Sequence, residues 1–248
     1  MKKSHETVEK ALIDGLLKGD PLPGCHLQSE RELALRFAVS RTTVREALLK
    51  MQKSGWISVQ QRHATVVNDF WSRGDWRLLS SITRNSEPFP ADLASHLLEL
   101  RIQFAPDYAR KAVKNNAAKL ISCLSRSHKL RDSLCSLVKF DWELHLTMAI
   151  LSGNKIYPLI LNSFADLYAK LKGGLFANEE TRAEARCFYR GLSEAARSGD
   201  PDLAEEVTRT AMKAGLENFK RQSQQVESHF NISSAEISAS QAGMLALP

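Results

Sequence analysis

Residues 29–51 contain two short helical patterns around a tight turn, and this pair constrains the fold more than any other part of the sequence. Ser29 followed by Glu32 forms a capping box, which predicts that a helix begins there. After a turn, Ser40 is a second N-cap. Apolar residues on the two helices recur on one face of each: Leu33, Ala34 and Phe37, then Val44, Ala47, Leu48 and Met51. The pattern predicts a helix-turn-helix.

Two strand-like stretches follow the second helix. Residues 57–59 and 64–67 are mostly β-branched, and the polar segment 60–63 separates them. Two strands with a polar, basic tip directly after a helix-turn-helix are typical of a wing. We therefore expect a winged helix-turn-helix domain over residues 1–68.

The charge of the chain is concentrated in this motif. The formal net charge is +6, and residues 31–62 alone hold seven Lys or Arg against two Glu. The exposed first turn of the second helix carries Arg41, Thr42, Thr43 and Arg45, groups that suit the major groove of double-stranded DNA. The alternative is a small helical subdomain with a solvated basic face.

Composition limits the class of protein. The chain has 248 residues, of which 43% are hydrophobic and 25% charged, as in globular proteins. No apolar run approaches the roughly 20 residues of a membrane span, and the N-terminus does not resemble a signal peptide. The four cysteines are scattered without metal-finger spacing, so we expect reduced thiols and a cytoplasmic protein without a membrane partner.

Three further segments follow the first domain. Residues 69–76 break the periodicity with Gly74 and two tryptophans and are predicted to be a packed linker. Residues 77–223 carry helical periodicity almost throughout and predict an all-helical antiparallel bundle of six or seven helices, whereas residues 224–248 are expected to form a flexible tail. The fold class is therefore mainly α.

Proline, glycine and capping residues predict where the helices of the bundle begin and end. Pro106 is expected to kink or end its helix, and the pair at 173–174, both glycine, to end another. Residues 152–154, Ser-Gly-Asn, are expected to close one helix and cap the next. Asp200 and Pro201 are expected to begin the last helix as its N-cap and first residue.

The motif at residues 23–48 resembles the winged-helix signature of GntR-family transcription regulators. The matching stretches are Pro-Gly at 23–24, Ser-Glu-Arg-Glu-Leu-Ala at 29–34 and Val-Ser-Arg-Thr-Thr-Val-Arg-Glu-Ala-Leu at 39–48. Similarity to the fatty-acid-responsive FadR group of that family continues from about residue 20 to residue 222. The resemblance implies that the following residues contact DNA: Arg31, Ser40, Arg41, Thr42, Thr43 and Arg45. At the wing tip this chain has Gln61, Arg62 and His63, where Gln61 and Arg62 replace the His-Gly pair of the group.

The same resemblance implies a non-enzymatic regulator that binds a palindromic operator as a homodimer and is released by long-chain acyl-CoA. It places an effector site in the helical domain, for which no cofactor is expected. The ligand-binding residues that it implies are Leu97, Leu98, Arg101, His145, Tyr168, Phe176, Tyr189 and Phe219. His145 replaces a Phe of the group and Phe219 a Trp, so the pocket has diverged. Any single aromatic among these residues could instead be plain core.

Asp141 and His145 raise an alternative effector. They lie four residues apart on one helix face and match the first half of an Asp-and-three-His metal site with which many relatives hold a small carboxylate. The later helices contain no matching histidine, so a buried His hydrogen-bonded to Asp is the favoured interpretation. A metal-dependent or acyl-thioester enzyme would need further ligands or a base, which the sequence does not offer.

Overall fold

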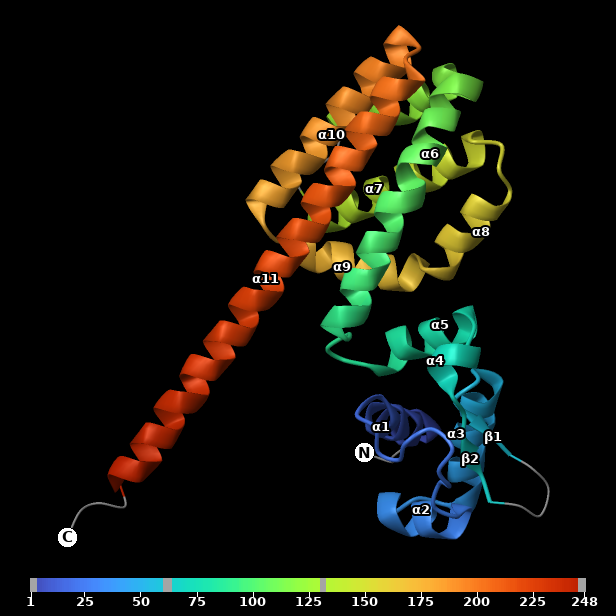
Figure 1. Ribbon diagram of the computed structural model, residues 1–248, viewed down its shortest axis with the longest axis vertical. Coiled ribbons are helices and arrows are strands. Elements are labelled where there is room, and N and C mark those ends of the chain that lie inside the picture. The colour runs from blue at the N-terminus through green and yellow to red at the C-terminus, as the bar shows by residue number, and fades with distance from the viewer. Residues whose placement is uncertain (1–3, 60–63, 130–132, 245–248) are drawn as a thin grey trace. The chain divides into compact units, whose positions relative to one another are not determined.

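The computed structural model describes residues 4–59, 64–129 and 133–244 of the chain. These residues form two compact units, Met1–Pro90 and Ala91–Pro248, called here the N-terminal and the C-terminal unit (Figure 1). In the described residues there are eleven α-helices and one two-stranded sheet, which confirms the mainly helical fold class. None of the helices in the described part of the chain is long and apolar enough to cross a membrane.

The N-terminal unit contains the predicted helix-turn-helix. Its helices are α1 (His5–Leu17), α2 (Glu30–Phe37), α3 (Arg41–Lys53), α4 (Phe70–Arg73) and α5 (Trp76–Asn85). The capping box of Ser29 and Glu32 is present at the start of α2. The Ser40 hydroxyl accepts a hydrogen bond from the Thr43 amide at 3.1 Å at the start of α3. Both helices therefore begin where the sequence predicts.

The core of the unit lies between α1, α2 and α3. All four apolar residues predicted for the inner face of α3 are buried, as are Leu33 and Ala34 of α2. Helix α1 adds Val8, Ile13 and Leu16, each at most 2% exposed. The charged residues of α2 and α3 consequently face outward.

The two strands of the wing pair antiparallel. Strand β1 (Ile57–Ser58) aligns Ile57 with Val67 of β2 (Val66–Val67), and Ser58 with Val66. Gly55 takes a positive φ of 86° in the turn between α3 and β1, a conformation that costs glycine little. The tip residues Gln61, Arg62 and His63 lie outside the described residues.

Helices α4 and α5 pack within the N-terminal unit, which extends to Pro90. The indole of Trp56 donates to the Ser81 hydroxyl at 3.0 Å, and the Asn85 amide donates to the Glu9 carboxylate at 3.2 Å. Trp56 also packs against Phe70, with ring centroids 4.8 Å apart. These buried contacts between segments distant in sequence extend the unit to Pro90.

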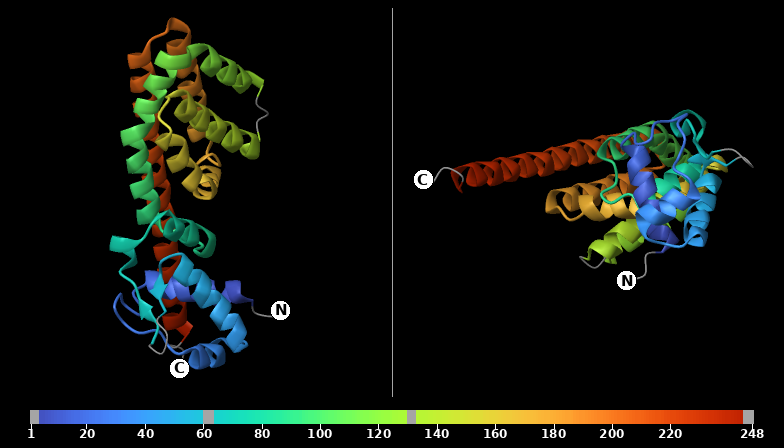
Figure 2. Two further views of the ribbon diagram at one scale, coloured as in Figure 1. Left: turned by 90° about the vertical axis from the view of Figure 1, so that its right-hand side faces the viewer. Right: turned by 90° about the horizontal axis from the view of Figure 1, so that it is seen from below.

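The C-terminal unit is an all-helical bundle. It comprises α6 (Ala91–Leu124), a 3₁₀ turn (Ser125–Lys129), α7 (Leu134–Leu151), α8 (Ile156–Ser163), α9 (Ala165–Leu175), α10 (Glu179–Ser198) and α11 (Pro201–Met244). Helices α6, α10 and α11 lie side by side, and α7 packs against α6 (Figures 1 and 2). The core includes Tyr108, Leu120, Leu144, Met148 and Leu192, all fully buried.

Several predicted boundaries in this unit are correct and others are wrong. Asp200 caps α11 by accepting hydrogen bonds from the amides of residues 202 and 203, and Asn154 accepts one from the amide of Ile156. Pro106 does not end α6, whose non-helical residue is instead Asn116, at φ −160°. The two glycines at 173–174 lie inside α9, because Lys172 and Leu175 on either side of them are buried. Helix α11 continues through the segment expected to be a flexible tail.

Candidate functional site

The N-terminus of α3 presents a polar, basic surface. Arg41, Thr42 and Arg45 are exposed and Thr43 is half-buried, whereas the opposite face of the helix is buried. Arg31 on α2 is exposed as well. A helix N-terminus with outward arginines and free amides suits the edges of bases and the phosphates of a DNA groove.

Some of these side chains already have partners within the chain. The Ser40 hydroxyl lies 2.9 Å from the Thr43 hydroxyl, so both take part in the helix cap. Arg45 donates from Nε to the Glu30 carboxylate at 3.1 Å. Both members of this ion pair are exposed to solvent, where such pairs contribute little to stability. Arg45 can therefore exchange Glu30 for a phosphate or a base at small cost.

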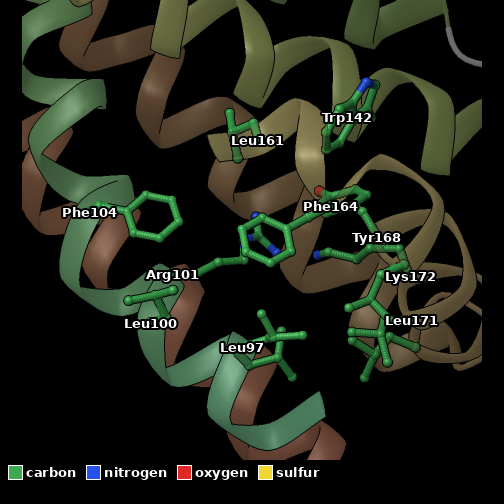
Figure 3. A pocket seen from close by; sticks show the side chains of 13 residues that line it. Leu97, Leu100, Arg101, Phe104, Trp142, Leu161, Phe164, Tyr168, Leu171 and Lys172 are labelled. Atoms are coloured by element: carbon green, nitrogen blue, oxygen red, sulfur yellow. The ribbon is translucent and has the colours of Figure 1, made fainter. Parts of the chain in front are cut away.

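The C-terminal unit contains an apolar pocket between α6, α7, α8 and α9, with a volume of about 490 Å³ including its mouth (Figure 3). Four of the sequence-predicted ligand residues line it: Leu97, Leu98, Arg101 and Tyr168. Nine residues that the sequence reasoning missed complete the lining: Leu100, Phe104, Trp142, Leu161, Phe164, Leu167, Leu171, Lys172 and Leu175. The helical spacing of Leu97, Leu100 and Phe104 on α6 is the signal that could have found part of this set.

The other four predicted ligand residues are not part of the lining. His145 and Tyr189 are buried in the bundle core beside Asp141. Phe176 is fully buried, with the Lys172 ammonium 4.6 Å from its ring centroid. Phe219 is half-buried on α11.

One side of the pocket carries a buried charged cluster, defined by Arg101, Asp141, His145, Tyr168 and Lys172. The Asp141 carboxylate lies 3.2 Å from the Lys172 ammonium and accepts a hydrogen bond from the Tyr168 hydroxyl. It also accepts one from the hydroxyl of Tyr189 at 2.9 Å. Burial by itself would raise the pKa of Asp141, but the positive charges of Lys172 and Arg101 and the hydrogen bond from Tyr168 together outweigh burial and hold this pKa well below its usual range. Asp141 is therefore an anion, and its carboxylate is held by the Lys172 ammonium and two tyrosine hydroxyls.

His145 is a neutral member of this cluster. Burial and the nearby Arg101 charge lower its pKa from 6.5 to about 3. Its Nδ1 lies 2.7 Å from the Tyr108 hydroxyl, whereas Nε2 is 4.0 Å from Asp141 and has no hydrogen-bond partner. Across the described residues, no group of three or more His, Cys, Asp or Glu side chains is placed to hold a metal ion. The cation at Asp141 is the Lys172 ammonium.

A winged helix with a basic recognition-helix surface, joined to a helical unit that contains a pocket, defines the class of DNA-binding regulators. Comparison with known proteins agrees. Residues 4–67 match the model of bacterial regulatory proteins of the gntR family, and residues 68–231 match the model of the FadR C-terminal domain. The latter match begins at residue 68, before the structural boundary at Pro90.

Two relatives, each named a fatty acid metabolism regulator protein, illustrate the similarity. The protein of Shewanella pealeana is 36% identical over 189 residues, which are 76% of this chain and 79% of that protein. The protein of Shewanella oneidensis is 36% identical over 185 residues, or 74% of this chain and 77% of that protein.

A solved structure of Lar, a protein described as controlling the expression of the Listeria monocytogenes agr system, has the same fold. It is 19% identical and gives a TM-score of 0.58, covering 89% of this chain and 98% of the other. The chain belongs to the GntR family of bacterial regulatory proteins, in the group with a FadR C-terminal domain. The resemblance seen in the sequence is thereby confirmed, and the chain is a transcription regulator and not an enzyme.

Proposed function

We propose that this chain regulates fatty acid metabolism in the cytoplasm by binding a palindromic operator as a homodimer, from which long-chain acyl-CoA releases it. The relatives named fatty acid metabolism regulators support the biological role. The observation that carries the proposal is the pairing, in one chain, of a basic recognition helix with an apolar pocket in the helical unit.

The DNA contacts are assigned to α2 and α3. Arg41 and Arg45 can each donate a pair of hydrogen bonds to guanine or reach phosphate, and the hydroxyls of Thr42 and Thr43 can bond phosphate or base edges. Ser40 contributes chiefly through the cap that fixes the first turn of α3. Arg31 would contact the backbone from α2. The wing-tip residues Gln61, Arg62 and His63 remain part of the proposal, with Arg62 suited to a minor groove.

Dimerisation follows from the geometry of reading DNA. One recognition helix reads only a few base pairs, so a symmetric pair bound to two half-sites roughly 34 Å apart doubles the contact. In this account the effector favours an arrangement in which the two recognition helices no longer match successive grooves. Such a shift requires that acyl-CoA binds the released form more tightly than the DNA-bound form.

The acyl chain is assigned to the pocket of the C-terminal unit. Its lining of leucine and aromatic side chains is supplied by four helices, and Leu97, Leu98, Arg101 and Tyr168 lie on it. A helix shift that widens the pocket for a longer chain would alter the packing of α6 against α11 and α7. The four other predicted ligand residues would not contact the acyl chain but would shape the pocket by packing against its lining residues. They are His145, Phe176, Tyr189 and Phe219.

The proposal is tested with DNA selected from a random library by the wild-type protein. We expect the selected DNA to be palindromic and to be bound by two copies of the chain. Arg45→Ala should weaken the affinity for this DNA at least tenfold. Arg197→Gln, an exposed arginine of α10, serves as the matched control and should bind normally. Selection of no DNA sequence, or unchanged binding by Arg45→Ala, would contradict the assignment.

A further inference from the structure

Glu9 is a buried carboxylate of the N-terminal unit that takes no part in the proposed DNA contacts. It lies on α1, is 5% exposed, and accepts a hydrogen bond at 3.2 Å from the side-chain amide of Asn85 on α5. Within the described residues, this amide is the hydrogen-bond partner of the carboxylate, and no cation pairs with it. Removing a carboxylate from water without a cation beside it costs stability. The contact is therefore better explained by the geometry that it fixes than by a gain in stability.

Asn85 connects Glu9 to the wing through Ser81. The Asn85 amide also donates to the carbonyl oxygen of Ser81 at 2.9 Å and to its hydroxyl at 3.4 Å. That hydroxyl in turn accepts a hydrogen bond from the indole of Trp56 at 3.0 Å. All four side chains are buried. Glu9, Asn85, Ser81 and Trp56, called here the α5 network, thus join α1, α5 and the residue that precedes β1.

Trp56 lies at the joint between the recognition helix and the wing. Its amide donates to the carbonyl of Met51 in the last turns of α3 at 3.0 Å. Its carbonyl accepts from the amide of Asn68, just after β2, at 2.9 Å. The backbone of Trp56 is therefore tied to α3 and to both ends of the wing. Because α5 holds the indole of the same residue, it holds the recognition helix and the wing together.

Helix α5 is the last helix of the N-terminal unit, and residues 86–90 connect it to α6 (Figure 1). The winged helix is thus attached to the following helices of the chain through α5. Helices that meet only through apolar side chains can slide past one another by small amounts, whereas directional hydrogen bonds between buried groups favour one arrangement. The α5 network consequently fixes the angle between the winged helix and α5.

This angle matters when two copies bind one DNA. The two recognition helices must reach half-sites about 34 Å apart, and one added base pair moves a half-site by about 3.4 Å and rotates it by about 35°. We propose that Glu9 and Asn85 are positioning residues for operator recognition, which set the half-site spacing that the dimer accepts without contacting the DNA. The inference rests on the proposed function in taking two copies to bind one palindrome.

The experiment measures the affinity of the full-length chain for four duplexes by fluorescence anisotropy. They are the selected palindrome, the same palindrome with its spacer one base pair longer or one shorter, and a single half-site. The wild type should bind the selected palindrome at least tenfold more tightly than each of the other three. Asn85→Asp places a second carboxylate against Glu9. It should weaken binding to the palindrome at least tenfold and to the half-site less than threefold, so that the selected spacing loses its advantage.

A double variant and a charge control separate positioning from other effects. In Glu9→Gln/Asn85→Asp the glutamine amide can donate to the introduced carboxylate, and the affinity for the palindrome should return to within threefold of the wild type. Arg84→Gln, at an exposed position of α5, changes the net charge by one in the same direction as Asn85→Asp and should keep the wild-type spacing preference. Equal losses on palindrome and half-site in Asn85→Asp, or no recovery in the double variant, would overturn the positioning role, because general destabilisation weakens both duplexes alike.

A second variant keeps the test decisive if circular dichroism shows that Asn85→Asp is unfolded. Ser81→Ala removes the acceptor of the Trp56 indole without adding a charge. It should lower the affinity for the palindrome at least threefold more than the affinity for the half-site, and equal losses on both would overturn the inference.

The outcomes for the wild type separate the two proposals. A wild type that binds the half-site as tightly as the palindrome contradicts the proposed dimer, and the inference fails with it. A wild type that discriminates between spacings, together with an Asn85→Asp variant that discriminates equally well, leaves the proposed function standing and overturns the inference.

Discussion

Lowering the pH should destabilise the C-terminal unit because the buried His145 resists protonation in the folded state. In the folded chain its pKa is about 3, because burial and Arg101 oppose the charged form, whereas in the unfolded chain it returns to about 6.5. Below pH 6.5 the unfolded state thus binds a proton that the folded state does not, so stability falls as the pH falls. The window for this loss extends from about pH 6.5 down to about pH 3.

The size of the effect follows from the two pKa values. Between pH 7 and pH 5, linkage through this single group costs the folded state about 2 kcal/mol. Asp141 adds little over that range, because its pKa is depressed and the stability it confers is lost only near and below its unfolded value of 3.8. His145 should therefore dominate the difference between wild type and a variant without a titratable ring.

The comparison uses His145→Gln, whose amide leaves a partner for the Tyr108 hydroxyl. Native-state hydrogen exchange of α7 amides, corrected for the intrinsic pH dependence of exchange, reports the stability of the unit. From pH 7 to pH 5 the wild type should lose about 2 kcal/mol more than the variant. An equal loss in both proteins, or a gain in the wild type, would mean that Asp141 keeps His145 protonated and would refute the reasoning.

Three further predictions test other contacts. Glu30→Gln should strengthen DNA binding two- to tenfold in a mobility-shift titration, because Arg45 no longer has an internal partner; weaker binding would mean that the pair positions Arg45 for DNA. Asp141→Asn should destabilise the C-terminal unit by about 3–5 kcal/mol in urea unfolding, since Lys172 and Arg101 lose their buried counter-ion, whereas the exposed Asp166→Asn should change little. Ser40→Ala should lower the free energy of unfolding by about 1 kcal/mol, because the hydrogen bond from the Thr43 amide to the Ser40 hydroxyl is lost. Ser40→Gly should cost less than the alanine variant, and an unchanged stability of Ser40→Ala would show that the cap is dispensable.

The helix-turn-helix was predictable because its signals are local. A capping box, a second N-cap and apolar spacing fix where α2 and α3 begin and which faces they bury, and the structure has both. The boundary predicted at residue 68 coincides with the junction of the two family models, whereas the division into compact units falls at Pro90, because it depends on contacts that sequence patterns do not show. Ser81 and Asn85 of α5 attach to Trp56 and Glu9, which are remote in sequence.

The pocket was partly predictable for the same reason. Resemblance placed Arg101 and Tyr168 on its wall, whereas Lys172 went unnoticed, because a lysine beside two glycines looks like part of an exposed helix end. In the structure the continuation of α9 through Gly173 buries that lysine against Asp141.

The most direct test of the account is the release of operator DNA by acyl chains. With the selected palindrome labelled and bound, acyl-CoAs of increasing chain length are titrated into the complex and the anisotropy of the DNA is followed. Release should grow with chain length until the chain fills the pocket, and CoA alone, the control without an acyl chain, should leave the complex intact. Anisotropy that stays constant with every chain length, or that falls equally with CoA alone, would contradict an acyl effector bound in the helical unit.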